Sequence, residues 1–121
     1  MKRNMDLVIA ILKKVEEGKD VTESSEYLDL KATDAEILYH LEIMSEAGLI
    51  KTRSFSTFEG VVYDVERLTW DGHEFLEAAR NETVVNQAKE FAKSKGLQLF
   101  DLPFDVMKDI LVNSINSIIT G

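Results

Sequence analysis

The chain has 121 residues, of which 45% are hydrophobic and 30% are charged, and it contains no cysteine. This composition excludes a disordered chain and a disulfide-stabilised one, and no apolar run approaches the roughly 20 residues of a membrane-spanning helix. The formal net charge of −8 opposes binding to phosphate backbones unless cations gather locally.

A first helix is predicted from Met5 to Glu17. Asn4 is a favourable N-cap, and Gly18 can end the helix in a left-handed conformation. The apolar residues that share one face of this helix are Met5, Val8, Ile9, Leu12 and Val15. Residues 19–32 are mostly polar, and either an extended segment near Glu26–Leu30 or a short helix is compatible with them.

The next helix is the predicted recognition helix. It begins after Thr33, because Thr33 and Glu36 have the spacing of a capping box, and it ends near Ala47, before Gly48. The arc expected to face the core holds Ile37, Leu38, Leu41, Met44 and Ala47, with His40 at its edge. The opposite arc combines an aromatic and an aliphatic side chain with three carboxylates: Tyr39, Ile43, Glu36, Glu42 and Glu46.

After this helix the pattern changes to that of β-strands. Leu49–Thr57 and Val61–Leu68 are rich in β-branched and aromatic residues, and the glycine of Phe58-Glu59-Gly60 predicts a hairpin turn between them. Thr69 then caps a further helix. The residues of that helix expected in the core are Trp70, Gly72, Phe75, Leu76 and Ala79.

The apolar stripe of this helix changes phase at Asn81-Glu82-Thr83, so a break is predicted there. The helix after the break should end at Gly96, and its apolar residues are Val84, Val85, Ala88, Phe91 and Ala92. Pro103 suits the first turn of a last helix that reaches Ile119. We therefore expect a winged-helix-like part in residues 1–96 and a C-terminal helix of the same domain in residues 97–121.

The order of elements predicts the fold class. A helix followed directly by a β-hairpin is typical of winged helix-turn-helix domains. The prediction is an α+β, mainly α fold: a winged helix-turn-helix-type domain with a β-hairpin wing and additional C-terminal helices. The helix that usually precedes the recognition helix in such domains is weak in residues 19–32.

Four segments carry a family resemblance. They are Met1-Lys2-Arg3-Asn4-Met5-Asp6-Leu7, then Tyr39-His40-Leu41 with Glu46-Ala47-Gly48-Leu49-Ile50, then Leu68-Thr69-Trp70-Asp71-Gly72-His73-Glu74-Phe75-Leu76, and Leu102-Pro103-Phe104-Asp105-Val106. In these segments the chain resembles a family of uncharacterised, mostly phage and prophage proteins with a predicted winged-helix fold. The resemblance implies a phage or prophage context, and with it the cytoplasm of a bacterial host.

No catalytic constellation is predicted. Nucleophilic catalysis needs a Ser, Cys or Thr beside a base, and the two histidines, His40 and His73, lie in different elements. His73 and Glu77 have the spacing to share a metal ion, but an exposed histidine beside a glutamate is the simpler interpretation. We therefore expect a binding protein without enzymatic activity, metal or cofactor.

Two binding functions remain open. Fold analogy favours a DNA-binding transcriptional regulator, although residues 34–50 hold four acidic residues and no Lys or Arg. The expected DNA contacts would be weak and would come from the cations outside this helix: Lys2, Arg3, Lys13, Lys14, Lys51 and Arg53. The other function is a protein-interaction adaptor or inhibitor, in which Tyr39 and Ile43, ringed by glutamates, contact a host or phage protein with a basic surface.

The last helix is apolar around more than half of its circumference. One domain face cannot cover so wide an arc, so we expect this helix to pair with the same helix of a second copy. The predicted homodimer contacts are Phe104, Met107, Ile110, Leu111, Ile115 and Ile118. The alternative is a helix packed deep within its own domain.

Overall fold

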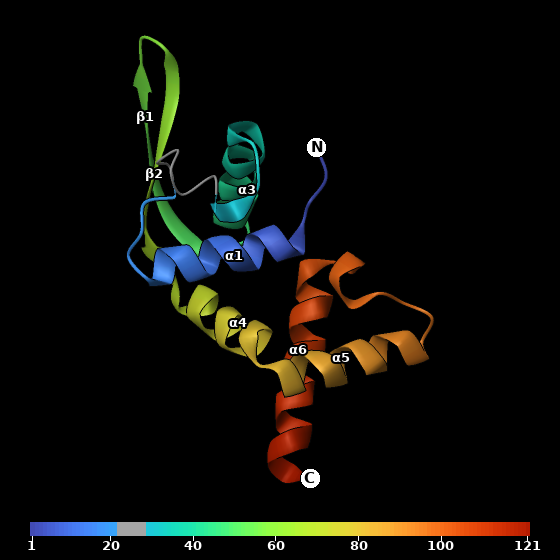
Figure 1. Ribbon diagram of the computed structural model, residues 1–121. Coiled ribbons are helices and arrows are strands. Elements are labelled where there is room, and N and C mark those ends of the chain that lie inside the picture. Colours follow the sequence, from blue (N-terminus) through green and yellow to red (C-terminus); the bar gives the residue numbers. More distant parts are fainter. Residues whose placement is uncertain (22–28) are drawn as a thin grey trace. The chain divides into compact units, whose positions relative to one another are not determined.

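The computed structural model describes residues 1–21 and 29–121 (Figure 1). Among these residues the chain is α+β and mainly helical, with five α-helices and one two-stranded antiparallel hairpin. Most of the Glu26–Leu30 segment lies outside the described residues. No helix of the described part combines the length and apolar character that crossing a membrane requires.

The described residues form two compact units, Met1–His73 and Glu74–Gly121. The first unit holds α1 (Met5–Glu16), α3 (Asp34–Glu46) and the hairpin, and the second holds α5 (Glu82–Ser94) and α6 (Phe104–Thr120). The boundary expected between residues 96 and 97 lies inside the second unit, and α4 (Trp70–Arg80) contributes to both.

The start of α1 follows the sequence prediction, but its buried face is rotated. The Asn4 side chain accepts a hydrogen bond from the Leu7 N–H at 3.2 Å. The buried side chains are Met5, Leu7, Val8, Ile11 and Leu12, whereas Ile9 and Val15 are only half-buried. Because every residue from Leu7 to Leu12 is apolar, several faces of the helix are equally hydrophobic there. The sequence pattern alone therefore could not predict which face is buried.

The capping box of α3 is confirmed, with the Glu36 N–H donating to Thr33 Oγ1 at 3.1 Å. Its buried face differs from the prediction, because His40 is buried and Leu38 is exposed. The His40 ring is satisfied on both sides. Its Nε2 accepts from the Asn4 N–H at 2.9 Å, and its Nδ1 lies 2.7 Å from the Glu36 carbonyl oxygen. A histidine with both nitrogens paired can occupy the core, and the helix turns Leu38 outward to place it there.

The hairpin consists of β1 (Ile50–Thr57) and β2 (Gly60–Leu68), paired from Ile50↔Leu68 to Thr57↔Gly60 with an irregularity after Lys51. Gly60 has a positive φ of +127°, whereas the turn residues Phe58 and Glu59 have negative φ angles. Thr57 Oγ1 holds the turn, since it donates to the Gly60 carbonyl at 2.9 Å and accepts from the Glu59 N–H at 3.2 Å. The tip of the hairpin is therefore well defined.

The start of α4 is capped as predicted, because Thr69 Oγ1 accepts from the Gly72 N–H at 2.9 Å. The prediction that Trp70 is a core residue was wrong, since its side chain is 78% exposed. On a helix, Trp70 lies opposite the face that buries Gly72, Phe75 and Leu76. The first helical position is set by the Thr69 cap, and that cap leaves the indole on the outer side.

In the second unit α5 follows α4 after the predicted break, and the Asn81 side chain caps it by accepting from the Val84 N–H at 3.1 Å. Val84, Ala88 and Ala92 are buried as expected, but Phe91 is exposed. Helix α6 packs against α5, preceded by the short 3-10 helix η1 (Leu99–Asp101).

Candidate protein-binding surface

The exposed side of α3 and the adjacent face of the hairpin form one surface. Ser45 Oγ and Thr52 Oγ1, 3.1 Å apart, join α3 to β1 at the base of this surface. Nearer the turn of the hairpin, Tyr63 of β2 lies close enough to Glu42 of α3 for the carboxylate to act on its phenol. We call Tyr39, Glu42, Ile43, Glu46 and Tyr63 the α3–hairpin surface. Glu42 and Glu46 are exposed and the other three are half-buried, so an aromatic and aliphatic floor lies beside two carboxylates.

The α3–hairpin surface carries a negative electrostatic potential. The pKa of Tyr63 is raised above its ordinary value, chiefly by the charge of Glu42, with smaller effects from burial, from the hydrogen bond to Glu42 and from the charge of Glu46. A nearby negative charge disfavours the phenolate, which explains the direction. The same field would attract a cation that approached these side chains.

Glu36, predicted as part of this surface, has a different role. Its Oε1 accepts from the Thr33 N–H at 3.3 Å and from the Thr33 hydroxyl at 3.1 Å, so the carboxylate closes the capping box. Tyr39 lies next to a core residue, because its ring centroid is 5.5 Å from that of the buried His40. We therefore keep Tyr39 in the surface and assign Glu36 to the start of the helix.

The predicted hairpin cation Arg53 is already paired. Its Nε lies 2.8 Å from a carboxylate oxygen of Glu66, and its guanidinium lies 3.4 Å from Asp64, its neighbour across the strands. Two carboxylates around one guanidinium leave no excess positive charge for a phosphate. These ion pairs weigh against Arg53 as a DNA contact, and that contact stays a prediction. Lys51, by contrast, is exposed and lies opposite Arg67 at the base of the hairpin.

The N-terminal segment, which carries two cations, and the hairpin lie on different sides of α3. In the view of Figure 1, α3 stands between the hairpin and the N-terminal segment that carries Lys2 and Arg3. Lys2 is exposed and Arg3 is half-buried. The acidic helix thus lies between two groups of residues that a DNA duplex would have to contact together.

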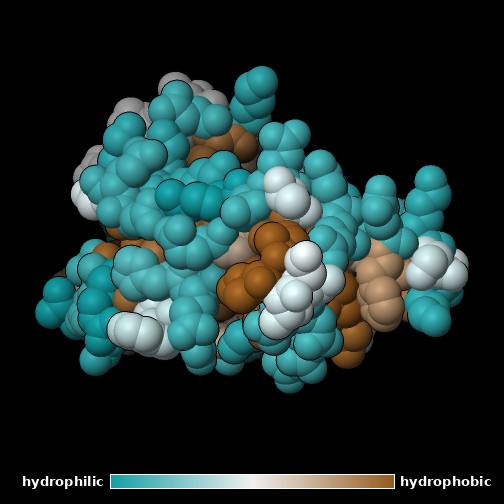
Figure 2. Space-filling view, turned by 90° about the horizontal axis from the view of Figure 1, so that it is seen from below, coloured by the Kyte–Doolittle hydropathy of each residue, from teal (hydrophilic) through white to brown (hydrophobic). Residues whose placement is uncertain are grey.

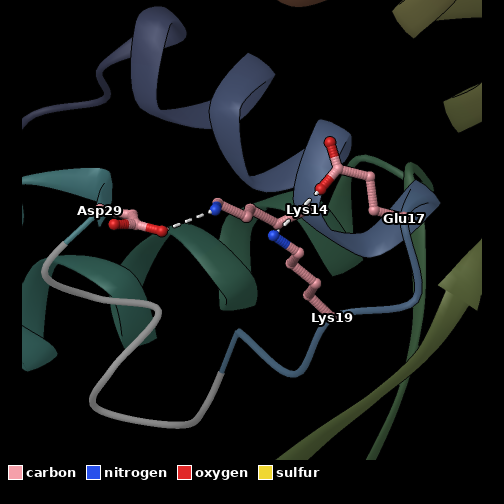
Figure 3. A network of polar contacts seen from close by, with 4 residues as sticks. All are labelled: Lys14, Glu17, Lys19 and Asp29. Atoms are coloured by element: carbon pink, nitrogen blue, oxygen red, sulfur yellow. Dashed lines mark hydrogen bonds and ion pairs between the residues drawn. The ribbon is translucent and has the colours of Figure 1, made fainter.

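Lys14 is also engaged within the chain. Figure 3 shows it extending from α1 to Asp29, with 3.0 Å between its Nζ and the carboxylate. Its side chain is only 17% exposed, and its hydrogen bond and charge lower the pKa of Asp29. Nearby, Lys19 pairs with Glu17 at 3.5 Å. Of the basic pair at the end of α1, Lys13 alone is exposed.

The end of the hairpin carries an apolar patch that sequence reasoning missed. We call it the hairpin tip: Phe55, Phe58, Val61 and Val62, all exposed. Phe58 occupies the turn, where Thr57 fixes the backbone, and Phe55 faces Val62 across the strands. Phenylalanine at a turn position that usually holds a polar residue was the available signal.

The predicted dimer contacts of α6 have different environments. Met107 and Leu111 are buried within the chain, and Phe104 packs on Phe75 with 5.0 Å between ring centroids. Met107 and Leu111 therefore serve packing within their own chain, whereas the dimer contact of the half-buried Phe104 stays a prediction. Ile110 and Ile115 are half-buried, and Ile118 is exposed.

The two residues of the candidate metal pair, His73 and Glu77, are both exposed on α4. A carboxylate oxygen of Glu77 lies 3.9 Å from Arg80. Within residues 1–21 and 29–121, no three His, Asp or Glu side chains are grouped closely enough to hold a metal ion.

Comparison with known proteins places the chain among sequences without a stated activity. The family model described as "Hypothetical protein (DUF2513)" matches residues 2–98, which include the α3–hairpin surface. An uncharacterized protein of Haemophilus influenzae is 37% identical over 111 residues, covering 91% of this chain and 92% of that relative. No solved structure matches the chain.

Proposed function

This chain belongs to the DUF2513 family, and we propose that it is a winged-helix-type adaptor or inhibitor that binds a basic segment of another protein and catalyses no reaction. In this proposal α3 is the recognition helix and the hairpin is the wing. Tyr39 and Ile43 supply the apolar contact, and Glu42 and Glu46 pair with Lys or Arg of the partner. The phage or prophage context implied by the sequence resemblance would make a host protein the natural target.

The observation that carries the proposal is the charge balance of the α3–hairpin surface. Glu42 and Glu46 raise the pKa of Tyr63, while Asp64 and Glu66 balance the charge of Arg53. Complementary charge speeds association and selects the partner. A cationic protein segment would be attracted to the carboxylates of this surface, whereas a phosphate backbone would be repelled by them.

The hairpin tip supports a protein partner for a second reason. Energetically dominant interface residues are often aromatic side chains that fill a pocket of the partner. Phe58 is fully exposed on a turn whose backbone is already fixed, so little conformational freedom would be lost on insertion. In this proposal the tip supplies an apolar anchor in addition to the charged contact made by α3.

Capture of a partner from bacterial lysate is expected to depend on the α3–hairpin surface. Changing Tyr39→Ala together with Ile43→Ala should reduce recovery of the captured protein at least about tenfold, because both apolar contacts are lost. Recovery should be unchanged by nuclease treatment. It is measured by quantitative mass spectrometry after pull-down with immobilised wild-type or variant protein.

The matched control is Lys51→Ala with Arg53→Ala, which alters the same unit without touching α3. This control should retain the partner. Circular dichroism must show that both variants are folded, since Tyr39 and Ile43 are half-buried. Loss of capture with the control, or on nuclease treatment, would contradict the proposed protein interaction.

One observation favours the alternative function of a DNA-binding transcriptional regulator. Lys51 and Arg67 face each other on the exposed base of the hairpin, where two cations are adjacent. Two cations neutralise few phosphates, so affinity should be weak, steeply reduced by salt and nearly independent of sequence.

Fluorescence anisotropy with several unrelated duplexes at low and physiological salt tests this expectation. Lys51→Ala should weaken all duplexes to a similar degree, and Tyr39→Ala with Ile43→Ala should leave them unchanged. Nanomolar binding of one duplex at physiological salt, abolished by the Tyr39 and Ile43 changes, would establish the regulator and refute the adaptor.

A further inference from the structure

The C-terminal turns of α6 project an apolar stripe into solvent. In Figure 1 this end of α6 continues past its crossing with α5. Ile119 is 76% exposed, Val112 and Ile118 are also exposed, and Ile115 is half-buried. Figure 2, a space-filling view coloured by hydropathy, shows that hydrophobic groups reach the surface among hydrophilic ones.

The stripe has the spacing of a helix-pairing seam. Val112, Ile115 and Ile119 follow one another by three and four residues, so they share one side of α6. Ile118 extends the same side toward the buried Leu111. Asn116 borders the stripe, and its amide can both donate and accept a hydrogen bond.

The charge distribution indicates which partner fits this stripe. The chain has a net charge of −8, yet residues 110–121 contain no ionisable side chain. A net negative charge makes two copies repel each other, and the end of α6 is a place where its own side chains add no charge to that repulsion. The Asn116 amide is also self-complementary across a twofold axis.

We propose that the stripe Val112, Ile115, Ile118 and Ile119 pairs with the same stripe of a second copy, giving a twofold homodimer. The hairpin tip does not fit this role, because Glu59 in its turn would oppose the Glu59 of the other copy. The α3–hairpin surface is acidic and excludes a second copy for the same reason. The dimer thus uses a different set of residues from that surface, and it does not depend on the proposed function.

The expected dimer is weak and responds to salt in a characteristic direction. Four aliphatic side chains per copy are few beside the roughly 20 to 30 residues on each side of a standard interface, so the dissociation constant should be on the order of 100 µM. Raising the salt concentration screens the repulsion between copies and leaves apolar contact intact. Self-association should therefore strengthen with salt, whereas a dimer held by ion pairs would weaken.

Sedimentation equilibrium from low micromolar to several hundred micromolar protein tests the proposal, at low and at high sodium chloride. Wild type should pass from monomer to dimer, with a smaller dissociation constant in high salt. Val112→Lys with Ile119→Lys should raise the dissociation constant at least about tenfold, because four buried cations would face each other. Both positions are exposed in the monomer, so the fold should be kept, which circular dichroism verifies.

The control is Val106→Lys, another exposed position of α6 that lies outside the stripe. It should dimerise like wild type. A wild type that stays monomeric throughout the range, a dimer that survives the Val112 and Ile119 changes, or a dimer weakened by salt would each overturn the proposal. A second control, Phe58→Ser, distinguishes pairing through the hairpin tip from pairing through the α6 stripe. Loss of the dimer in that variant would also overturn the proposal.

Discussion

Gly72→Ala is expected to destabilise the first unit by about 3 kcal/mol or more, although alanine is the better helix former. Gly72 is buried at the start of α4, where the helix touches the backbone of Leu49. A Cβ at this position would lie 2.0 Å from the Leu49 carbonyl oxygen, far inside contact distance. Neither backbone can yield easily, because Thr69 ties them together by accepting from the Gly72 N–H and donating to the Gly48 carbonyl.

Urea denaturation followed by circular dichroism measures this effect as a change in the free energy of unfolding. The matched control is His73→Ala, the next residue along, whose side chain is exposed. That substitution should change stability by no more than about 0.5 kcal/mol. A Gly72→Ala protein as stable as the control would show that α4 and the start of β1 do not approach as closely as described.

The contact at Gly72 also shows what the sequence could predict and what it could not. Helix ends were predicted within a residue or two, because caps such as Asn4, Thr33 and Thr69 act on backbone groups only three residues away. The hairpin was predicted from its β-branched and aromatic residues and from Gly60 at the turn. The contact between Gly72 and Leu49 depends on tertiary packing, so a local sequence pattern could not predict it.

Helix faces were harder to predict than helix ends. Trp70 was expected in the core and is exposed, and Leu38 was expected inside where His40 lies instead. Hydrophobicity ranks a tryptophan and a leucine above a histidine, but the ranking omits the hydrogen bonds that another element provides. The Asn4 N–H, distant in sequence, makes His40 a core residue.

The candidate surface was predicted in part. The spacing on one helix was enough to bring Tyr39, Ile43, Glu42 and Glu46 together, because all four belong to α3. Tyr63 was missed, since its contact with Glu42 requires the placement of the hairpin beside the helix. The pairing of Arg53 with Asp64 follows from the hairpin register, which the turn at Phe58-Glu59 sets.

His40→Leu is expected to destabilise the protein by about 2–4 kcal/mol, even though leucine is the more hydrophobic residue. The substitution leaves the Asn4 N–H at the start of α1 without its acceptor, and a branched side chain does not match the space of a flat ring. Because this bond joins α1 to α3, its loss should also loosen the N-terminal segment.

The two hydrogen bonds of His40 also predict its tautomer. Nε2 accepts from the Asn4 N–H, so the proton lies on Nδ1 and is donated to the Glu36 carbonyl. Nitrogen chemical shifts measured by NMR should therefore show the Nδ1–H form for His40. His40→Gln, whose side-chain oxygen can reach the position of Nε2, should recover part of the stability lost in His40→Leu, while His73→Gln should have almost no effect. An Nε2–H tautomer, or equal stability of the leucine and glutamine variants, would show that the bond to Asn4 does not hold the two helices together.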